Sequence, residues 1–141
     1  MFVYDIILSK KDLFIMSEFN IKEIREKTGL SQAKFAKKYH ITKKSILNWE
    51  QGCTVPPEYA KSIIPRLVEL EPYDAPYEEI TYDIDEVLRP FGYAPRTKIE
   101  QKLGLKPRTL EKWVQGTSKT PEYVLYGLKK IVEDLQNQGK L

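Results

Sequence analysis

The 141-residue sequence contains an internal repeat at an offset of 64 residues. The segment WEQGCTVPPEY, residues 49–59, returns as WVQGTSKTPEY, residues 113–123, with six identities in eleven positions. The match continues backwards without a gap as far as Ile24 and Arg25, which meet Leu88 and Arg89. A match of this quality is hard to reach by chance, so the chain is predicted to be two copies of one unit of about 50 residues.

The repeat divides the chain into four parts. Unit 1 covers residues 20–70, and unit 2 covers residues 84–141. An acidic linker with two prolines, residues 71–83, joins the units. Residues 1–19 form an N-terminal arm: either an apolar segment that packs on the core or on a second subunit, or the product of a start placed upstream of a natural start at Met16.

The net charge of +3 hides an uneven distribution. Residues 20–70 carry ten Lys and Arg against five Asp and Glu, and residues 87–141 carry eleven against five. Residues 71–86 hold seven acidic side chains and no basic one. Basic blocks of this size suit a polyanion such as nucleic acid. The alternative is that the lysines are solvated surface.

Composition excludes several classes of site. One cysteine, Cys53, and one histidine, His40, leave no disulfide framework, no cysteine-cluster metal site and little for a nucleophile–histidine pair. Without paired carboxylates or a phosphate loop either, we predict no catalytic residue, no metal, no cofactor and no enzymatic activity. No segment approaches the roughly 20 apolar residues of a membrane span, and the N-terminus is not ordered like a secretory signal. We therefore expect a cytoplasmic protein with no membrane partner.

The boundary residues of unit 1 predict short helices. Asn20, Ser31 and Thr42 are N-cap residues, and Gly29 and Gly52 are typical of helix C-termini. His40 stands where unit 2 has Gly104, so this turn position is predicted to have a positive φ.

The last two helices are predicted from their prolines. A fourth helix of unit 1 begins near Pro57 and is ended or kinked by Pro65. In unit 2, Pro107 starts the third helix, and the final helix runs from Pro121 to about Leu135. Helical spacing of apolar residues places five of them in the cores of the two units: Phe35, Ile46, Trp49, Leu110 and Trp113.

The segment IREKTGLSQAKFAKKYHITKKSILNWEQG, residues 24–52, resembles the Cro/cI-type (XRE-like) helix-turn-helix family. Unit 2 resembles it more weakly, because Pro95 and Arg96 replace Ser31 and Gln32, and Val114 replaces Glu50. The resemblance implies an all-α fold: two tandem lambda-repressor-like helix-turn-helix units of four to five short helices, joined by the acidic linker.

The resemblance also implies which residues meet DNA. The third helix of such a unit enters the major groove, where its first residues and one a turn later reach base edges. In unit 1 these are Lys43, Lys44, Ser45 and Asn48, while Gln32 binds a backbone phosphate. The remaining candidates are phosphate contacts in unit 1 and the matching positions of unit 2: Lys34, Lys38, Arg96, Arg108, Thr109 and Lys112.

The predicted function is a sequence-specific regulator of transcription, a repressor, that binds double-stranded DNA. The alternative is an antitoxin-like protein that binds a partner toxin and autoregulates its operon; the acidic linker would suit a basic partner. Two readings of unit 2 also stay open: it reads a second half-site, as in an intramolecular dimer, or it is a packing or partner-binding module. A monomer acting as a pseudo-dimer and a homodimer are both compatible with the sequence.

Overall fold

A computed structural model describes residues 19–141; the predicted roles of the N-terminal arm concern residues that lie almost wholly outside this part of the chain. All regular elements between residues 19 and 141 are helices. In unit 1 they are α3 (Ile21–Thr28), α4 (Gln32–Tyr39), α5 (Lys43–Gln51) and α6 (Glu58–Leu70). In unit 2 they are α7 (Ile84–Leu88), η1 (Arg89–Phe91), α8 (Arg96–Leu103), α9 (Glu111–Val114) and α10 (Glu122–Asn137).

The helix ends of unit 1 confirm the predicted capping residues. The side chains of Asn20, Ser31 and Thr42 each accept the backbone N–H three residues further on, at 3.1–3.2 Å. Each of these bonds satisfies an amide that the helix itself leaves free. Gly29 and Gly52 end α3 and α5 in the left-handed conformation. His40 ends α4 with φ of 61°, as predicted from its match to Gly104.

The longest helix of each unit was predicted with different success. α6 continues through Pro65 to Leu70, so this proline does not end the helix; of the two predicted outcomes, only a kink stays a prediction. α10 starts after Pro121, as predicted, and extends two residues beyond Leu135.

The helices of unit 2 follow those of unit 1 at a nearly constant offset. α8 lies 64 residues after α4, and Gly104 has φ of 74° at the position of His40. For the first helix the offset is 63: Asp83 caps α7 by accepting the N–H of Glu86, as Asn20 accepts that of Glu23. The gapless alignment is therefore wrong by one residue in this helix, and the counterpart of Arg25 is Leu88.

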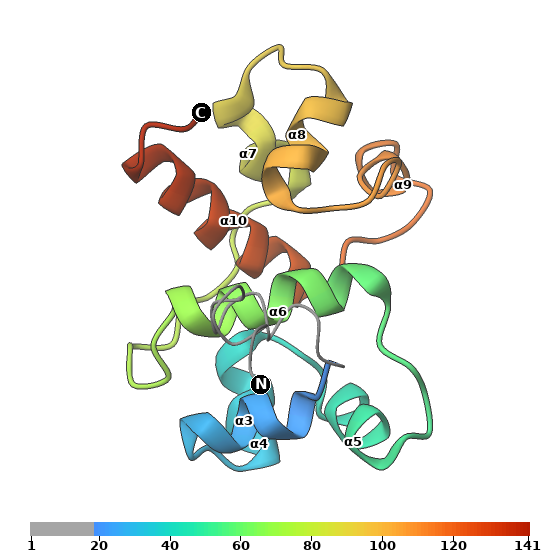
Figure 1. The fold of residues 1–141 in the computed structure, drawn as a ribbon, viewed down its shortest axis with the longest axis vertical. Coiled ribbons are helices and arrows are strands. Elements are labelled where there is room, and N and C mark those ends of the chain that lie inside the picture. Colours follow the sequence, from blue (N-terminus) through green and yellow to red (C-terminus); the bar gives the residue numbers. More distant parts are fainter. Residues whose placement is uncertain (1–18) are drawn as a thin grey trace, which may run out of the picture.

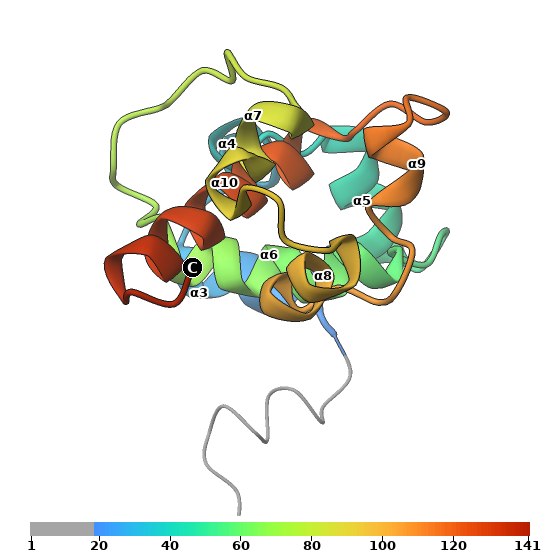
Figure 2. The ribbon, with the colours of Figure 1, turned by 90° about the horizontal axis from the view of Figure 1, so that it is seen from above.

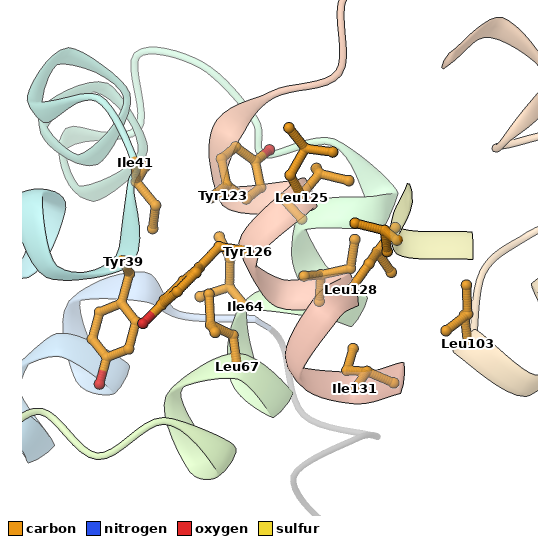
Figure 3. Close-up of a cluster of buried hydrophobic side chains, with 14 of the residues drawn as sticks. Tyr39, Ile41, Ile64, Leu67, Leu103, Tyr123, Leu125, Tyr126, Leu128 and Ile131 are labelled. Atoms are coloured by element: carbon orange, nitrogen blue, oxygen red, sulfur yellow. The ribbon is translucent and has the colours of Figure 1, made fainter. Parts of the chain in front are cut away.

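The two units share one hydrophobic core, whose centre is the contact between α6 and α10 (Figure 1). Figure 3 shows Tyr39 and Ile41 on one side of α10 and Leu103 of α8 on the other, with side chains of α6 and α10 between them. Of the five predicted core residues, Phe35, Ile46, Leu110 and Trp113 are buried. Trp49 is only half-buried at the edge of the core.

The acidic linker packs against both units instead of forming a free spacer. Glu71 is 8% exposed, and its carboxylate accepts hydrogen bonds from the Lys38 ammonium of unit 1 and the Tyr126 hydroxyl of unit 2. Glu78 accepts a hydrogen bond from Lys130 at 3.1 Å, and its carbonyl oxygen lies 2.7 Å from Nε2 of His40. These contacts attach the linker to α4 of unit 1 and to α10 of unit 2.

Candidate nucleic-acid interface

The first turn of α5 presents basic and polar side chains to solvent. Thr42 caps the helix, and Lys43 and Lys44 are exposed immediately after it. Ser45 and Asn48 are half-buried, whereas Ile46 is fully buried against the core. A helix anchored by its inner face in this way can offer its N-terminal residues to another molecule.

A hydrogen-bonded cluster holds α5 against the first two helices. The Arg25 guanidinium binds the Glu50 carboxylate through two nitrogens, at 2.7 and 3.1 Å, and Gln32 Nε2 donates to the same carboxylate at 3.1 Å. Burial alone would raise the pKa of Glu50, but the hydrogen bonds from Arg25 and Gln32 outweigh it and hold the pKa below its usual value. The side chain of Gln32, the first residue of α4, is therefore held in one place.

The environment of Lys38 differs from that of a DNA contact, the role predicted for it. It is 7% exposed, and its ammonium donates to Glu71 Oε2 at 3.1 Å, to the carbonyl oxygen of Ala75 at 2.8 Å and to that of Pro76 at 3.2 Å. An ammonium has three protons, and all of them are used inside the protein. Lys38 therefore stabilises the linker and is not available to a phosphate, whereas Lys34 is exposed.

The matching segment of unit 2 has a different backbone. Residues 107–110 form turns, and α9 contains only four residues, so the expectation that Pro107 starts a helix is wrong. Arg108 is exposed and has φ of 69°, a left-handed conformation that interrupts a helix. The exposed first helical turn of α5 therefore has no helical counterpart here.

Glu100 explains this difference, and sequence reasoning did not single it out. The residue is 2% exposed, and its two carboxylate oxygens accept the backbone N–H groups of Arg108 at 3.1 Å and Leu110 at 3.0 Å. The hydrogen bonds from these two amides are thus accepted by a side chain, so the turn needs no helical carbonyl acceptors for them. The counterpart of Glu100 in unit 1 is Ala36, and a buried-face alanine aligned with a glutamate was the available signal.

The remaining candidates of unit 2 differ in how freely they can reach a ligand. Arg96 is exposed at the start of α8. Thr109 donates its hydroxyl to the carbonyl oxygen of Lys106 at 2.7 Å. Lys112, at the position of Asn48, is half-buried and lies over the rings of Tyr59 and Trp113, 5.0 and 5.3 Å from their centroids. A cation held over two aromatic rings is stabilised where it is.

Both α5 and α9 lie on the same side of the molecule. Figures 1 and 2, which are related by a rotation of 90°, both place them at the right, away from the C-terminus. The two segments that the repeat aligns are thus presented in one general direction, on either side of the α6–α10 contact.

Residues 21–63 match the family model described as helix-turn-helix. This segment is a helix-turn-helix domain. Domains of this type belong to DNA-binding regulators, as the resemblance in residues 24–52 implied. The match ends within α6 and does not reach unit 2, whose assignment as a second copy stays a prediction. Neither a curated protein nor a solved structure matches the chain.

Two further findings concern residues 19–141 alone. No group of three or more His, Cys, Asp and Glu side chains in this part of the chain is arranged to hold a metal ion. None of its helices combines the length and the apolar character that crossing a membrane requires.

Proposed function

We propose that the protein is a sequence-specific regulator that binds double-stranded DNA with α5 of the helix-turn-helix domain in the major groove. The observation that supports the proposal is the first turn of α5: Lys43 and Lys44 are exposed at its start, on the third helix of the segment that matches the helix-turn-helix model. A major groove about 12 Å wide admits a helix presented in this way.

Each side chain at this surface has a role that suits its chemistry. Lys43 and Lys44 donate to guanine O6 and N7, and Asn48 pairs with adenine through its amide; Ser45 adds a hydroxyl contact. Gln32 donates to a backbone phosphate, and its hydrogen bond to Glu50 holds it ready for that contact. Phosphate contacts by Gln32 and by Lys34 fix the register of the protein on the duplex.

We further infer that binding represses transcription, because a protein seated in the groove of a promoter keeps the polymerase from the same DNA. The antitoxin-like alternative rested on the acidic linker as a surface for a basic partner. Glu71 and Glu78, two of the linker carboxylates, are paired with lysines of the protein itself. No observation favours the alternative over DNA binding.

The test is a selection from random double-stranded DNA, run with the wild-type protein and with the variants Lys44→Ala and Asn48→Ala. We expect an enriched motif, and each variant should lose about 1–3 kcal/mol on that site and discriminate less at one base pair. Lys27→Ala, which removes an exposed charge from α3, is the matched control and should keep the motif. The absence of any motif would contradict the proposed function, and unchanged discrimination in both α5 variants would contradict the role of this helix.

A further inference from the structure

The contact between the two units is reciprocal. Trp49 of unit 1 packs edge-on against Tyr123 of unit 2, with ring centroids 6.1 Å apart and an interplanar angle of 85°. Trp113 of unit 2 packs against Tyr59 of unit 1 in the same way, at 5.0 Å and 83°. Trp113 and Tyr123 are the residues 64 positions after Trp49 and Tyr59. When residue i contacts j and the equivalents exchange the same contact, the interface has the pattern of a two-fold symmetric dimer.

Equivalent residues also meet each other, as they must near a two-fold axis. Tyr59 and Tyr123 stack with ring centroids 6.4 Å apart and an interplanar angle of 22°. Ile63 of α6 faces its own counterpart, Gly127 of α10, so closely that a Cβ atom at Gly127 would lie 2.3 Å from Ile63 Cγ2. An approximate two-fold axis therefore passes between α6 and α10.

The symmetry accounts for α5 and α9 facing the same way (Figures 1 and 2), because a two-fold rotation keeps the position of an element along the axis, so equivalent elements lie at the same end of that axis. Helix-turn-helix dimers use this arrangement to contact two half-sites about one helical turn, roughly 34 Å, apart. Here the two units of one chain take the places of the two subunits. The surface through which such subunits would meet is buried between the units.

The two DNA-facing segments are chemically unequal. α9 has only four residues, and Arg108 in the turn before it has a left-handed backbone conformation that a helix does not allow. Lys112 lies over two aromatic rings. Three basic side chains of unit 2 in or near this segment nevertheless remain exposed: Lys106, Arg108 and Lys119. Exposed charges without a base-reading helix suit the phosphate backbone, which every DNA sequence presents alike.

We propose that unit 2 takes the place of a second subunit, so that one chain binds two adjacent half-sites: one read through its bases by α5, and one held through its phosphates by unit 2. This inference rests on the proposed function. It predicts an asymmetric site, with a specified half-site on one side only and protected but unspecified DNA on the other.

The first part of the test uses the full chain and the motif obtained by selection. Hydroxyl-radical footprinting should show protection over the motif and again about one helical turn away on one side, where the selected sequences vary freely. Sedimentation should show one chain per site. An inverted repeat bound by two chains would overturn the proposal while leaving the proposed function intact.

The second part removes charge from unit 2 with Lys106→Ala and Arg108→Asn in one chain; asparagine tolerates the left-handed backbone at position 108. The motif should be unchanged, protection on the far side should disappear, and the salt dependence of log K should flatten by about 1.8. The control removes two charges near the C-terminus, with Lys102→Ala and Lys140→Ala; Lys102 donates to the carbonyl oxygen of Lys140, away from α5 and α9.

The outcomes separate the two proposals. Equal salt dependence in the charge variant and the control, or protection confined to the motif, would show that unit 2 does not hold DNA and would overturn this inference alone. If the wild-type chain selects no motif at all from random DNA, the proposed function is overturned as well. Circular dichroism of both variants establishes that they keep the wild-type helix content, so a lost footprint reports lost charge.

Discussion

The segments α4–α5 and α8–α9 have similar sequences and different surfaces. In unit 1, Thr42 caps a helix of nine residues whose first turn is exposed. In unit 2, the equivalent residues form turns around the carboxylate of Glu100, and four helical residues remain. Glu100 stands at the position of Ala36. Its carboxylate gives the backbone amides of Arg108 and Leu110 an acceptor that an alanine cannot provide. Where a helix starts therefore depends on which acceptor its free backbone amides find.

The clusters that hold these segments differ in the same way. In unit 1, Arg25 and Gln32 both donate hydrogen bonds to the carboxylate of Glu50. At the equivalent positions unit 2 has Leu88, Val114 and Arg96, and the first two pack against the hydrophobic core. An apolar pair can hold two helices together as well as an ion pair does. Only the version with the glutamate, however, also fixes the side chain of Gln32, through its hydrogen bond to Glu50.

The largest expected effect comes from the two tryptophans. Trp113 is 4% exposed, so Trp113→Ala should destabilise the protein by about 3–5 kcal/mol. Trp49→Ala should cost less, because its ring is already partly exposed. Urea denaturation measures both, and each variant retains one tryptophan as a fluorescent probe of the other unit. A greater loss for Trp49→Ala would contradict the difference in burial.

The close approach of α6 and α10 gives the second prediction. Gly127→Ala should cost about 1–3 kcal/mol, because the added methyl group meets Ile63 Cγ2. Adding Ile63→Ala frees this space, so the double variant should lose less stability than the sum of the two single variants. Ser62→Ala, at an exposed position of α6, is the control and should change stability by less than about 0.5 kcal/mol. Additive losses would show that the two positions do not meet.

The third prediction converts the charged cluster of unit 1 into that of unit 2. Glu50→Val should cost about 1–3 kcal/mol, because the half-buried Arg25 guanidinium loses its partner. Adding Arg25→Leu, which reproduces the pair Leu88 and Val114, should recover most of this loss. Thermal unfolding of the wild type and the three variants, including Arg25→Leu alone, measures the cycle. A double variant no more stable than Glu50→Val would mean that the two units are not interchangeable at this contact.

The smallest effect is the pH dependence of Glu71, which contacts both units. Burial alone would raise its pKa, but the hydrogen bonds from Tyr126 and Lys38 and the charge of Lys130 hold the pKa below its usual value. The unfolded chain then binds more protons in acid, so this contribution to stability is present above about pH 4.3 and is lost as pH falls through the lower folded pKa. Glu71→Gln should be less stable than the wild type at pH 7, and the gap should narrow in acid. A gap that stays constant between pH 7 and pH 3 would contradict this assignment.

Sequence reasoning was most accurate where the cause is local. The caps at Asn20, Ser31 and Thr42 and the positive φ of His40 follow from the chemistry of a few neighbouring residues. It was less accurate where a distant partner decides. The burial of Lys38 depends on Glu71 and on carbonyl groups of the linker more than thirty residues away, and no spacing rule contains that information.

The helical class and the repeat at 64 residues could be derived from the sequence alone, because caps, turns and apolar spacing depend on neighbouring positions. The helix-turn-helix character was implied by a family resemblance in residues 24–52, and the match over residues 21–63 confirms it. Two features became evident only in the folded chain: α6 meets α10 across an approximate two-fold axis, and the Glu100 carboxylate accepts amides of the turn that stands in place of a helical turn. These features depend on which side chains meet after the chain has folded. Those contacts are determined by close packing and by buried hydrogen bonds between residues that are far apart in the sequence.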